Sequence, residues 1–268
     1  MIRATLTILS IMLLSGILSE SKAQGKLGAF IGGGTMWYQG DLNETPLPHP
    51  MTMRWTANAG LWWQIHQRWA LQLNYTAGEV WGDDEFASTG NNQARALKFQ
   101  SFIHEIGIRG TYDILRNDKW NFLPFITVGL AALNFEPKRD TVALRALQTE
   151  GVSYGNWSIA FPLGIGAKYQ FDCNWALKLE ANYHLILTDY LDDVSGDYPA
   201  TEVPFYSDPG NVSDTRDLRG NPSTLDGMWD INLGVVYFFT GCTSKNIYED
   251  CKELNKGVDM DMLLEMYK

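Results

Sequence analysis

Apolar and polar side chains alternate along most of the chain. From Met53 to Ile65 the odd positions are apolar or aromatic, whereas the even positions are mostly small or polar. A soluble strand usually ends after about five or six residues, and this alternation continues well beyond that length. A repeat of two residues predicts a β-strand with one apolar face and one polar face.

The same alternation recurs along the remaining sequence. It is found in the segments 26–38, 69–77, 102–114, 120–132, 157–171, 175–187 and 229–239. Together with 53–65 these segments give eight predicted strands, an even number, as single-chain outer-membrane barrels require. We therefore expect an all-β fold, an eight-stranded antiparallel transmembrane barrel of the outer-membrane type.

Alternation alone does not decide which face points outward, because a soluble ligand-binding barrel would carry its apolar face inside. The polar faces consist mostly of small residues, which suit the narrow interior of an eight-stranded barrel, so we expect the bulky faces outside. Aromatic residues cluster near the strand ends, as the two interfaces of a bilayer favour. Examples are Trp63, Trp69 and Trp175 at one rim and Trp55, Trp157 and Trp229 at the other.

The predicted connections alternate between short and long. Short ones fall at 66–68, 116–119 and 172–174, and long ones at 39–52, 82–95, 136–155 and 190–227. Membrane barrels combine short periplasmic turns with longer external loops. The sequence therefore predicts a multi-pass protein of the cell outer membrane, in contact with its lipid, with both termini in the periplasm.

The two ends of the chain differ from the barrel. Residues 1–23 combine a basic start at Arg3 with a short apolar run, which predicts a secretory signal peptide rather than a buried N-terminal helix. The barrel is then expected over residues 24–240, and residues 241–268 form a short periplasmic tail. This tail is either a weakly amphipathic helix that docks on a partner or a frayed acidic segment.

Composition excludes several classes of protein. Of the 268 residues, 45% are hydrophobic, 13% aromatic and 19% charged, and intrinsic disorder requires the opposite balance. The formal charge of -10 and the isoelectric point near 4.8 argue against a nucleic-acid partner. The mean hydropathy of -0.19 argues against a bundle of membrane helices.

Charged side chains occur on several faces that we expect to line the lumen. Unpaired charges inside a narrow barrel are unfavourable, so these residues predict a mutually neutralising polar network instead of a pore or a catalytic site. His184 lies on the same kind of face and is expected to be satisfied there. The network residues are Glu105, Arg109, Lys168, Lys178 and Glu180.

Other candidate chemistry is sparse. No histidine cluster, paired thiol ligands or phosphate loop is recognisable, so we expect no metal or cofactor. Ser195 and His49 could form a nucleophile and base only through chance packing of loops, so no enzyme is expected. The acidic segment 190–227, with Asp189, Asp192 and Asp193 near a strand end, is expected to be a solvated acidic surface rather than a calcium site.

All three cysteines map to the predicted periplasmic side, where disulfides form. Cys173 lies in a short turn, whereas Cys242 and Cys251 follow the last strand. Pairing of Cys173 with Cys242 would fasten the tail to the barrel rim, and pairing of Cys242 with Cys251 would close a loop in the tail. Unpaired thiols, or one thiol bonded to a partner, remain open as well.

Two segments carry a resemblance to a known family. The first strand leads into Tyr38, Gly40, Asp41 and Asn43, and a later segment contains Asp189, Tyr190, Asp192, Asp193 and Gly196. With their neighbours these segments resemble the PorG-type barrels, outer-membrane components of the Bacteroidota type IX secretion system. The similarity covers residues 26–240, and the cysteine-bearing tail has no counterpart in the pattern.

The resemblance implies a function as well as a fold. It implies a non-enzymatic barrel that anchors or organises the periplasmic ring of the protein secretion machinery, a ring built from a lipoprotein and its partner protein. Such barrels support secretion and, in gliding species, gliding motility. The alternative is a stand-alone structural or adhesive barrel that binds ligands through its external loops.

Overall fold

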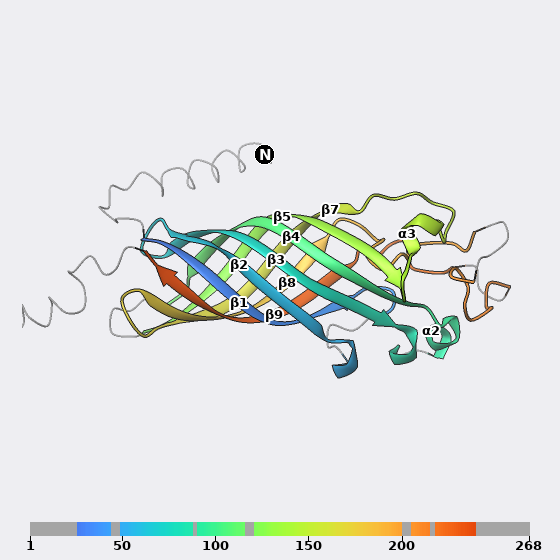
Figure 1. The fold of residues 1–268 in the computed structure, drawn as a ribbon, viewed down its shortest axis with the longest axis horizontal. Coiled ribbons are helices and arrows are strands. Elements are labelled where there is room, and N and C mark those ends of the chain that lie inside the picture. The colour runs from blue at the N-terminus through green and yellow to red at the C-terminus, as the bar shows by residue number, and fades with distance from the viewer. Residues whose placement is uncertain are drawn as a thin grey trace, which may run out of the picture.

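The chain forms one antiparallel sheet that closes on itself (Figure 1). The structure is a computed structural model, and it describes residues 26–43, 49–87, 90–115, 121–199, 205–214 and 218–239. The strand order is β4-β3-β2-β1-β9-β8-β7-β5-β6, and pairing of β4 with β5 completes the circle. The predicted closed barrel of eight long strands is confirmed, and β6 is a two-residue extension paired only with β5.

The bounds of the elements are as follows. The strands are β1 (Lys26–Gln39), β2 (Arg54–Gln64), β3 (Trp69–Asp83), β4 (Lys98–Asp113), β5 (Phe122–Arg139), β6 (Val142–Ala143), β7 (Trp157–Gln170), β8 (Trp175–Ile186) and β9 (Gly227–Phe238). The short helices are η1 (Pro50–Thr52), η2 (Asp84–Phe86), α2 (Gly90–Arg95) and α3 (Leu144–Leu147).

Strands β3, β4 and β5 are longer than predicted. Their pairing continues beyond the apolar alternation, where Glu79 lies opposite Phe102 and Asp83 lies opposite Lys98. The apolar pattern marks only the part of a strand that contacts lipid, whereas backbone hydrogen bonds extend the strands past it. The sheet therefore projects beyond the apolar belt on the β3–β5 side.

The long connections gather at one end of the barrel, which we call the long-loop end. In Figure 1 this end lies on the right, where α2 and α3 are found. The opposite end, which we call the short-turn end, carries the β2–β3 and β7–β8 turns. The first residues of β1 and the last residues of β9 also lie at this end, because Gly28 pairs with Phe238. The predicted signal peptide and the predicted tail, with Cys242 and Cys251, lie outside the described residues.

The outward face of the barrel is an apolar belt. Side chains at alternate strand positions are exposed, and Ile31 and Ile165 reach 69% and 66% exposure. Exposed aromatics lie at strand ends, among them Trp55, Trp63, Trp69, Trp157, Trp175 and Phe239. Trp37 in β1 differs from these exposed aromatics, because it is buried and its ring stacks on Trp229 with centroids 6.3 Å apart.

The alternation had suggested a polar interior, but apolar side chains also point into the barrel. Large aromatic side chains point inward, and each of three lies over a glycine of the neighbouring strand. Phe30 pairs with Gly60, Phe99 with Gly82 and Phe125 with Gly166, and a Cβ on any of these glycines would meet the aromatic ring. Glycine thus makes room for bulky residues inside a barrel of this size.

Two apolar clusters and a charged layer fill the barrel from end to end. A small cluster around Phe30, Trp62 and Phe238 lies toward the short-turn end. A larger cluster around Met36, Phe99 and Phe135 lies toward the long-loop end and continues into the loops. The charged layer lies between them.

Candidate functional site

The charged layer contains four of the five residues predicted for the lumen network. The Arg109 guanidinium lies 3.0 Å from Glu105 Oε1 and 3.1 Å from Glu180 Oε1, and Lys178 Nζ lies 2.8 Å from Glu180 Oε2. All four side chains are fully buried. Lys168 is not part of this layer but pairs with Asp113 at 3.0 Å, nearer the short-turn end, where its ammonium also lies 4.2 Å from the Trp62 ring centroid.

His184 connects two carboxylates in the same layer. Its Nδ1 lies 2.6 Å from Glu105 Oε2, and its Nε2 lies 2.5 Å from Asp230 Oδ2. A neutral imidazole carries one N–H, so an imidazolium satisfies both contacts as donor. It also balances the layer, in which Arg109 and Lys178 face three carboxylates. With the imidazolium, three positive charges face three carboxylates, so the charges of this buried layer sum to zero.

The two segments that resemble the PorG-type barrels meet at the long-loop end. Tyr38 Oη lies 2.5 Å from Asp192 Oδ2 and 2.9 Å from Asp226 Oδ1, and all three residues are buried. One hydroxyl proton cannot serve two carboxylates, so one carboxyl keeps its own proton. Burial, followed by the charge of the neighbouring Asp226, raises the pKa of Asp192 well above its usual value. Burial and the charge of Asp189 do the same for the pKa of Asp226.

Gly40 and Asn43 shape the first segment around this cluster. Their backbones are joined by two hydrogen bonds of 3.0 and 3.1 Å, and Asn43 Nδ2 donates to the Tyr38 carbonyl at 2.8 Å. A Cβ at Gly40 would overlap the Tyr38 hydroxyl and the Asp226 carboxylate, so only glycine fits there. Asp41 Oδ2 accepts a hydrogen bond of 3.1 Å from the Asn221 amide.

A buried arginine joins three of the long loops. The Arg95 guanidinium binds the Asp84 carboxylate through two bonds of 2.7 and 2.8 Å. It also donates to the Asp41 carbonyl at 3.0 Å and to the Arg219 carbonyl. Burial raises the pKa of Asp84 despite this pairing, whereas the Asp84 carboxylate outweighs burial and raises the pKa of Arg95.

A second buried arginine joins the remaining loop to these three. Arg219 donates to Glu150 Oε1 at 3.1 Å, to the Ser207 carbonyl at 3.1 Å and to the Asp193 carbonyl. Glu150 in turn accepts the amides of Ser195 and Gly196, both at 3.0 Å. We call the residues held by Arg95 and Arg219 the loop cap.

Asp193, Asp189 and Tyr190 complete the second segment. The Asp193 carboxylate accepts hydrogen bonds from Thr149 and from Tyr154, and burial raises its pKa. The Tyr190 ring stacks on Tyr154 with centroids 4.5 Å apart. Burial raises the pKa of Asp189 to about 7.

The expected solvated acidic surface is therefore wrong for the part of the loop nearest the barrel. Asp192, Asp193 and Asp226 are buried because hydroxyls, backbone amides and Arg219 replace water around them. Among the described residues no group of acidic, histidine or cysteine side chains is arranged to hold a metal ion.

The sequence analysis did not identify several residues that form the lumen ion pairs and the loop cap. Asp113 and Asp230 lie at alternate positions on lumen faces, so parity and charge together could have identified them. Arg95 is the last residue of the short helix α2, whereas Glu150 and Arg219 lie in loops, and no periodic signal marks any of the three. Their role depends on contacts between segments far apart in the sequence.

Ser195 and His49 are engaged separately. The Ser195 amide binds Glu150, and the His49 ring stacks on Phe86 with centroids 4.6 Å apart. Cys173 is disulfide-bonded. In the part of the chain that the structure covers, no helix combines the length and apolar character needed to span a bilayer.

These features define a transmembrane β-barrel of the outer-membrane class, closed, filled and capped at one end. The chain belongs to the family described as Domain of unknown function (DUF6089), whose model matches residues 4–212. No curated protein matches the sequence.

Solved structures with similarity to the chain include three outer-membrane proteins. Neisserial surface protein A is 11% identical with a TM-score of 0.45, and the match covers 80% of this chain and 97% of that one. OprG from Pseudomonas aeruginosa is 11% identical with a TM-score of 0.40 and coverages of 81% and 95%. The attachment invasion locus protein Ail of Yersinia pestis is 9% identical with a TM-score of 0.39 and coverages of 80% and 99%.

Proposed function

We propose that this protein is a non-enzymatic, non-conducting barrel of the outer membrane that anchors or organises the periplasmic ring of the type IX secretion machinery. Its long-loop end faces the exterior, and its short-turn end and termini face the periplasm. Its partners there are the ring lipoprotein and the protein that assembles with it. In gliding species the same machine supports gliding motility.

The observation that carries the proposal is the meeting of the two PorG-like segments. Tyr38 from the first segment and Asp192 from the second share one buried hydrogen-bond cluster, although they are separated by 154 positions in the chain. Residues that determine a resemblance and also contact one another form a structural signature of the fold. This supports the relationship to the PorG-type barrels over a coincidence of short motifs.

The filled lumen supports a scaffold rather than a channel. Two apolar clusters enclose the charged layer, so ions that enter would have to displace packed side chains. A non-conducting barrel can still act as a scaffold that binds partner proteins at its rims. The short-turn rim is the side that a periplasmic ring could reach.

Crosslinking tests the partner assignment. A photo-crosslinking residue replaces exposed Gln67 in the β2–β3 turn or exposed Asp172 in the β7–β8 turn, with exposed Met51 in the loop cap region as the matched control. We expect ring proteins to be captured from the two turn positions and not from Met51. Capture from Met51 alone, or normal cargo secretion after deletion of the gene, would contradict the proposal.

A second candidate is a stand-alone structural or adhesive barrel that binds ligands through its external loops. The observation that favours it is the presence of large apolar side chains exposed around the loop cap, among them Met51, Phe205, Leu218 and Leu225. Polar substitution of these four residues should abolish attachment under this hypothesis. Under the secretion hypothesis the same variant still secretes cargo.

A further inference from the structure

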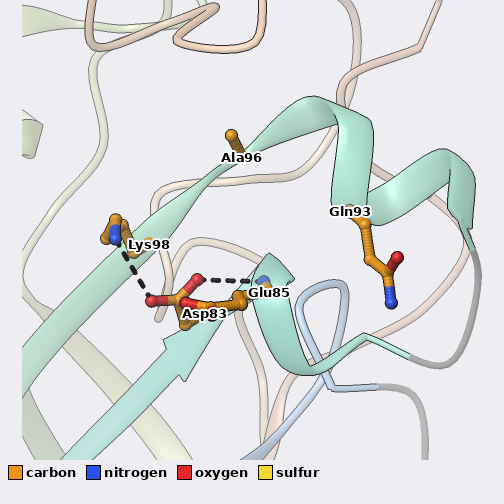
Figure 2. A pocket seen from close by; sticks show the side chains of 5 residues that line it. All are labelled: Asp83, Glu85, Gln93, Ala96 and Lys98. Carbon is orange, nitrogen blue, oxygen red and sulfur yellow. Dashed lines mark hydrogen bonds and ion pairs between the residues drawn. The ribbon is translucent and has the colours of Figure 1, made fainter.

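A pocket of about 290 Å³ opens on the outer side of the β3–β4 connection. It is lined by Asp83 at the end of β3, Glu85 in η2, Gln93 in α2, Ala96 between α2 and β4, and Lys98 at the start of β4. Figure 2 shows Asp83 between its two partners, with Gln93 projecting from α2. Its volume is close to the lower limit of small-ligand sites, about 300 Å³.

The lining offers hydrogen-bond acceptors and donors side by side. Asp83 is 5% exposed and is fixed by the Glu85 amide at 3.0 Å and by the Lys98 ammonium at 3.4 Å. Glu85, Gln93 and Lys98 are exposed. Gln93 Nε2 donates one hydrogen bond of 3.0 Å to the Ala87 carbonyl, which leaves the second amide hydrogen and the amide oxygen for a ligand. A carboxylate accepts, an ammonium donates, and an amide does both.

This combination suits vicinal hydroxyl groups, because each hydroxyl donates one hydrogen bond and accepts others. Two carboxylates face one ammonium, so a bare phosphate or carboxylate ligand would meet a net negative charge. A neutral, hydroxyl-rich ring such as a pyranose sugar matches both the polarity and the size of the pocket.

The position of the pocket indicates where such a sugar would come from. Phe102 on β4 is an exposed belt aromatic and contacts Trp55 across the rim, with ring centroids 5.7 Å apart. Lys98 lies four residues farther along the same strand, roughly 13 Å at about 3.3 Å per residue. Trp81 on β3 lies opposite Gln100, between Phe102 and Lys98, and the Arg54 guanidinium lies 4.5 Å from its ring centroid.

The outward face is thus continuous from the lipid belt, past Trp81, to the pocket. We propose that this pocket binds a sugar unit in the headgroup of a glycolipid in the outer leaflet. The proposal rests on the outer-membrane orientation proposed above, but it does not depend on a role in secretion.

The test uses the full-length purified barrel in detergent micelles. The variant E85A/Q93A removes two exposed side chains from the pocket, and the matched control K138A removes an exposed lysine from β5, opposite Gln100 and outside the pocket. The probes are intact lipooligosaccharide, its deacylated saccharide, and phosphatidylglycerol vesicles. The shift of the barrel on unheated gels verifies that each variant is folded.

We expect E85A/Q93A to weaken binding of intact lipooligosaccharide by about tenfold, as for loss of one hydrogen bond to a charged group. K138A should change it by less than about twofold, the scale of an exposed charge. The deacylated saccharide should compete for the site but bind more weakly than the intact lipid.

Three results would overturn the proposal. Equal losses in E85A/Q93A and K138A would show that the loss is not specific to the pocket, and phosphatidylglycerol binding as tight as that of lipooligosaccharide would exclude sugar recognition. Deacylated saccharide that binds as tightly as the intact lipid would assign the pocket to a soluble sugar. Cargo secretion by an E85A/Q93A strain reports separately on the proposed function, and we expect it to be normal.

Discussion

Replacement of Arg219 by methionine should open the loop cap while leaving the barrel folded. The side chains of Arg219 and Glu150 are 1% and 4% exposed, and their atoms lie 3.1 Å apart. Methionine keeps much of the aliphatic volume but removes the guanidinium. The Glu150 and Asp193 carboxylates then lose a cationic partner in a place that water does not reach.

The expected magnitude follows from the geometry. Removal of one partner of a buried ion pair costs about 3–5 kcal/mol. Glu150 keeps two backbone amide donors, from Ser195 and Gly196, so we take the lower end of that range. A change of about 3 kcal/mol increases the open fraction of the cap roughly a hundredfold.

Hydrogen exchange of backbone amides measures this opening. We expect faster exchange at the amides of Gly196 and Gly220, because Gly196 binds Glu150 and the Gly220 amide donates to the Gly196 carbonyl at 3.0 Å. Amides in β7 and β8 should keep their protection. The double variant R219M/E150Q removes one uncompensated charge and should recover part of the loss.

The matched control is R68M, which removes an exposed arginine from the β2–β3 turn, where it lies 3.3 Å from the Tyr112 hydroxyl. Unchanged exchange in R219M would refute the idea that Arg219 holds the cap. A uniform loss of protection across the barrel strands would refute the separation of cap from barrel.

Two further predictions concern pH and the lumen. The folded cap raises the pKa of Asp192 and of Asp226 by burial, and that of Asp189 to about 7, so it binds protons that the unfolded cap releases above about pH 4. Cap stability is therefore highest below that pH and falls as the pH rises to 7 and beyond. Limited proteolysis across this pH range measures the stability of the cap, and the D226N substitution should flatten the profile. Cap stability that rises with pH would contradict the assignment. In the lumen, R109M leaves two buried carboxylates without their guanidinium and should lower the free energy of unfolding by about 3–5 kcal/mol, measured by urea unfolding in lipid vesicles. A loss as small as that in K138M, which alters an exposed side chain, would show that the charged layer does not stabilise the barrel.

The strands were predictable because alternation is a local property. A residue's parity decides its face, so the outward belt and the inward position of Arg109 and Glu180 follow from the order of residues in each strand. The strand ends were less predictable. Beyond the belt, at Glu79 and Lys138, the alternation of polarity stops while backbone pairing continues.

The loop cap could not be predicted in the same way. The Tyr38–Asp226 contact joins residues separated by 188 positions, and Arg95 reaches the Arg219 carbonyl across 124 positions. No periodicity links such pairs. An acidic loop read by itself suggests a hydrated surface, because its partners are not visible in its own sequence.

The amino-acid sequence by itself determined that this chain is a barrel, which strands it contains and which of their faces meets lipid. These properties depend only on the two-residue repeat of a strand and on the contrast between lipid and lumen. Tertiary structure decided which lumen charges pair, that aromatic rings fill the spaces above glycines, and that buried arginines join the long loops into a cap. Those outcomes depend on contacts between residues that are far apart in the sequence, and such residues come close together only in the closed barrel.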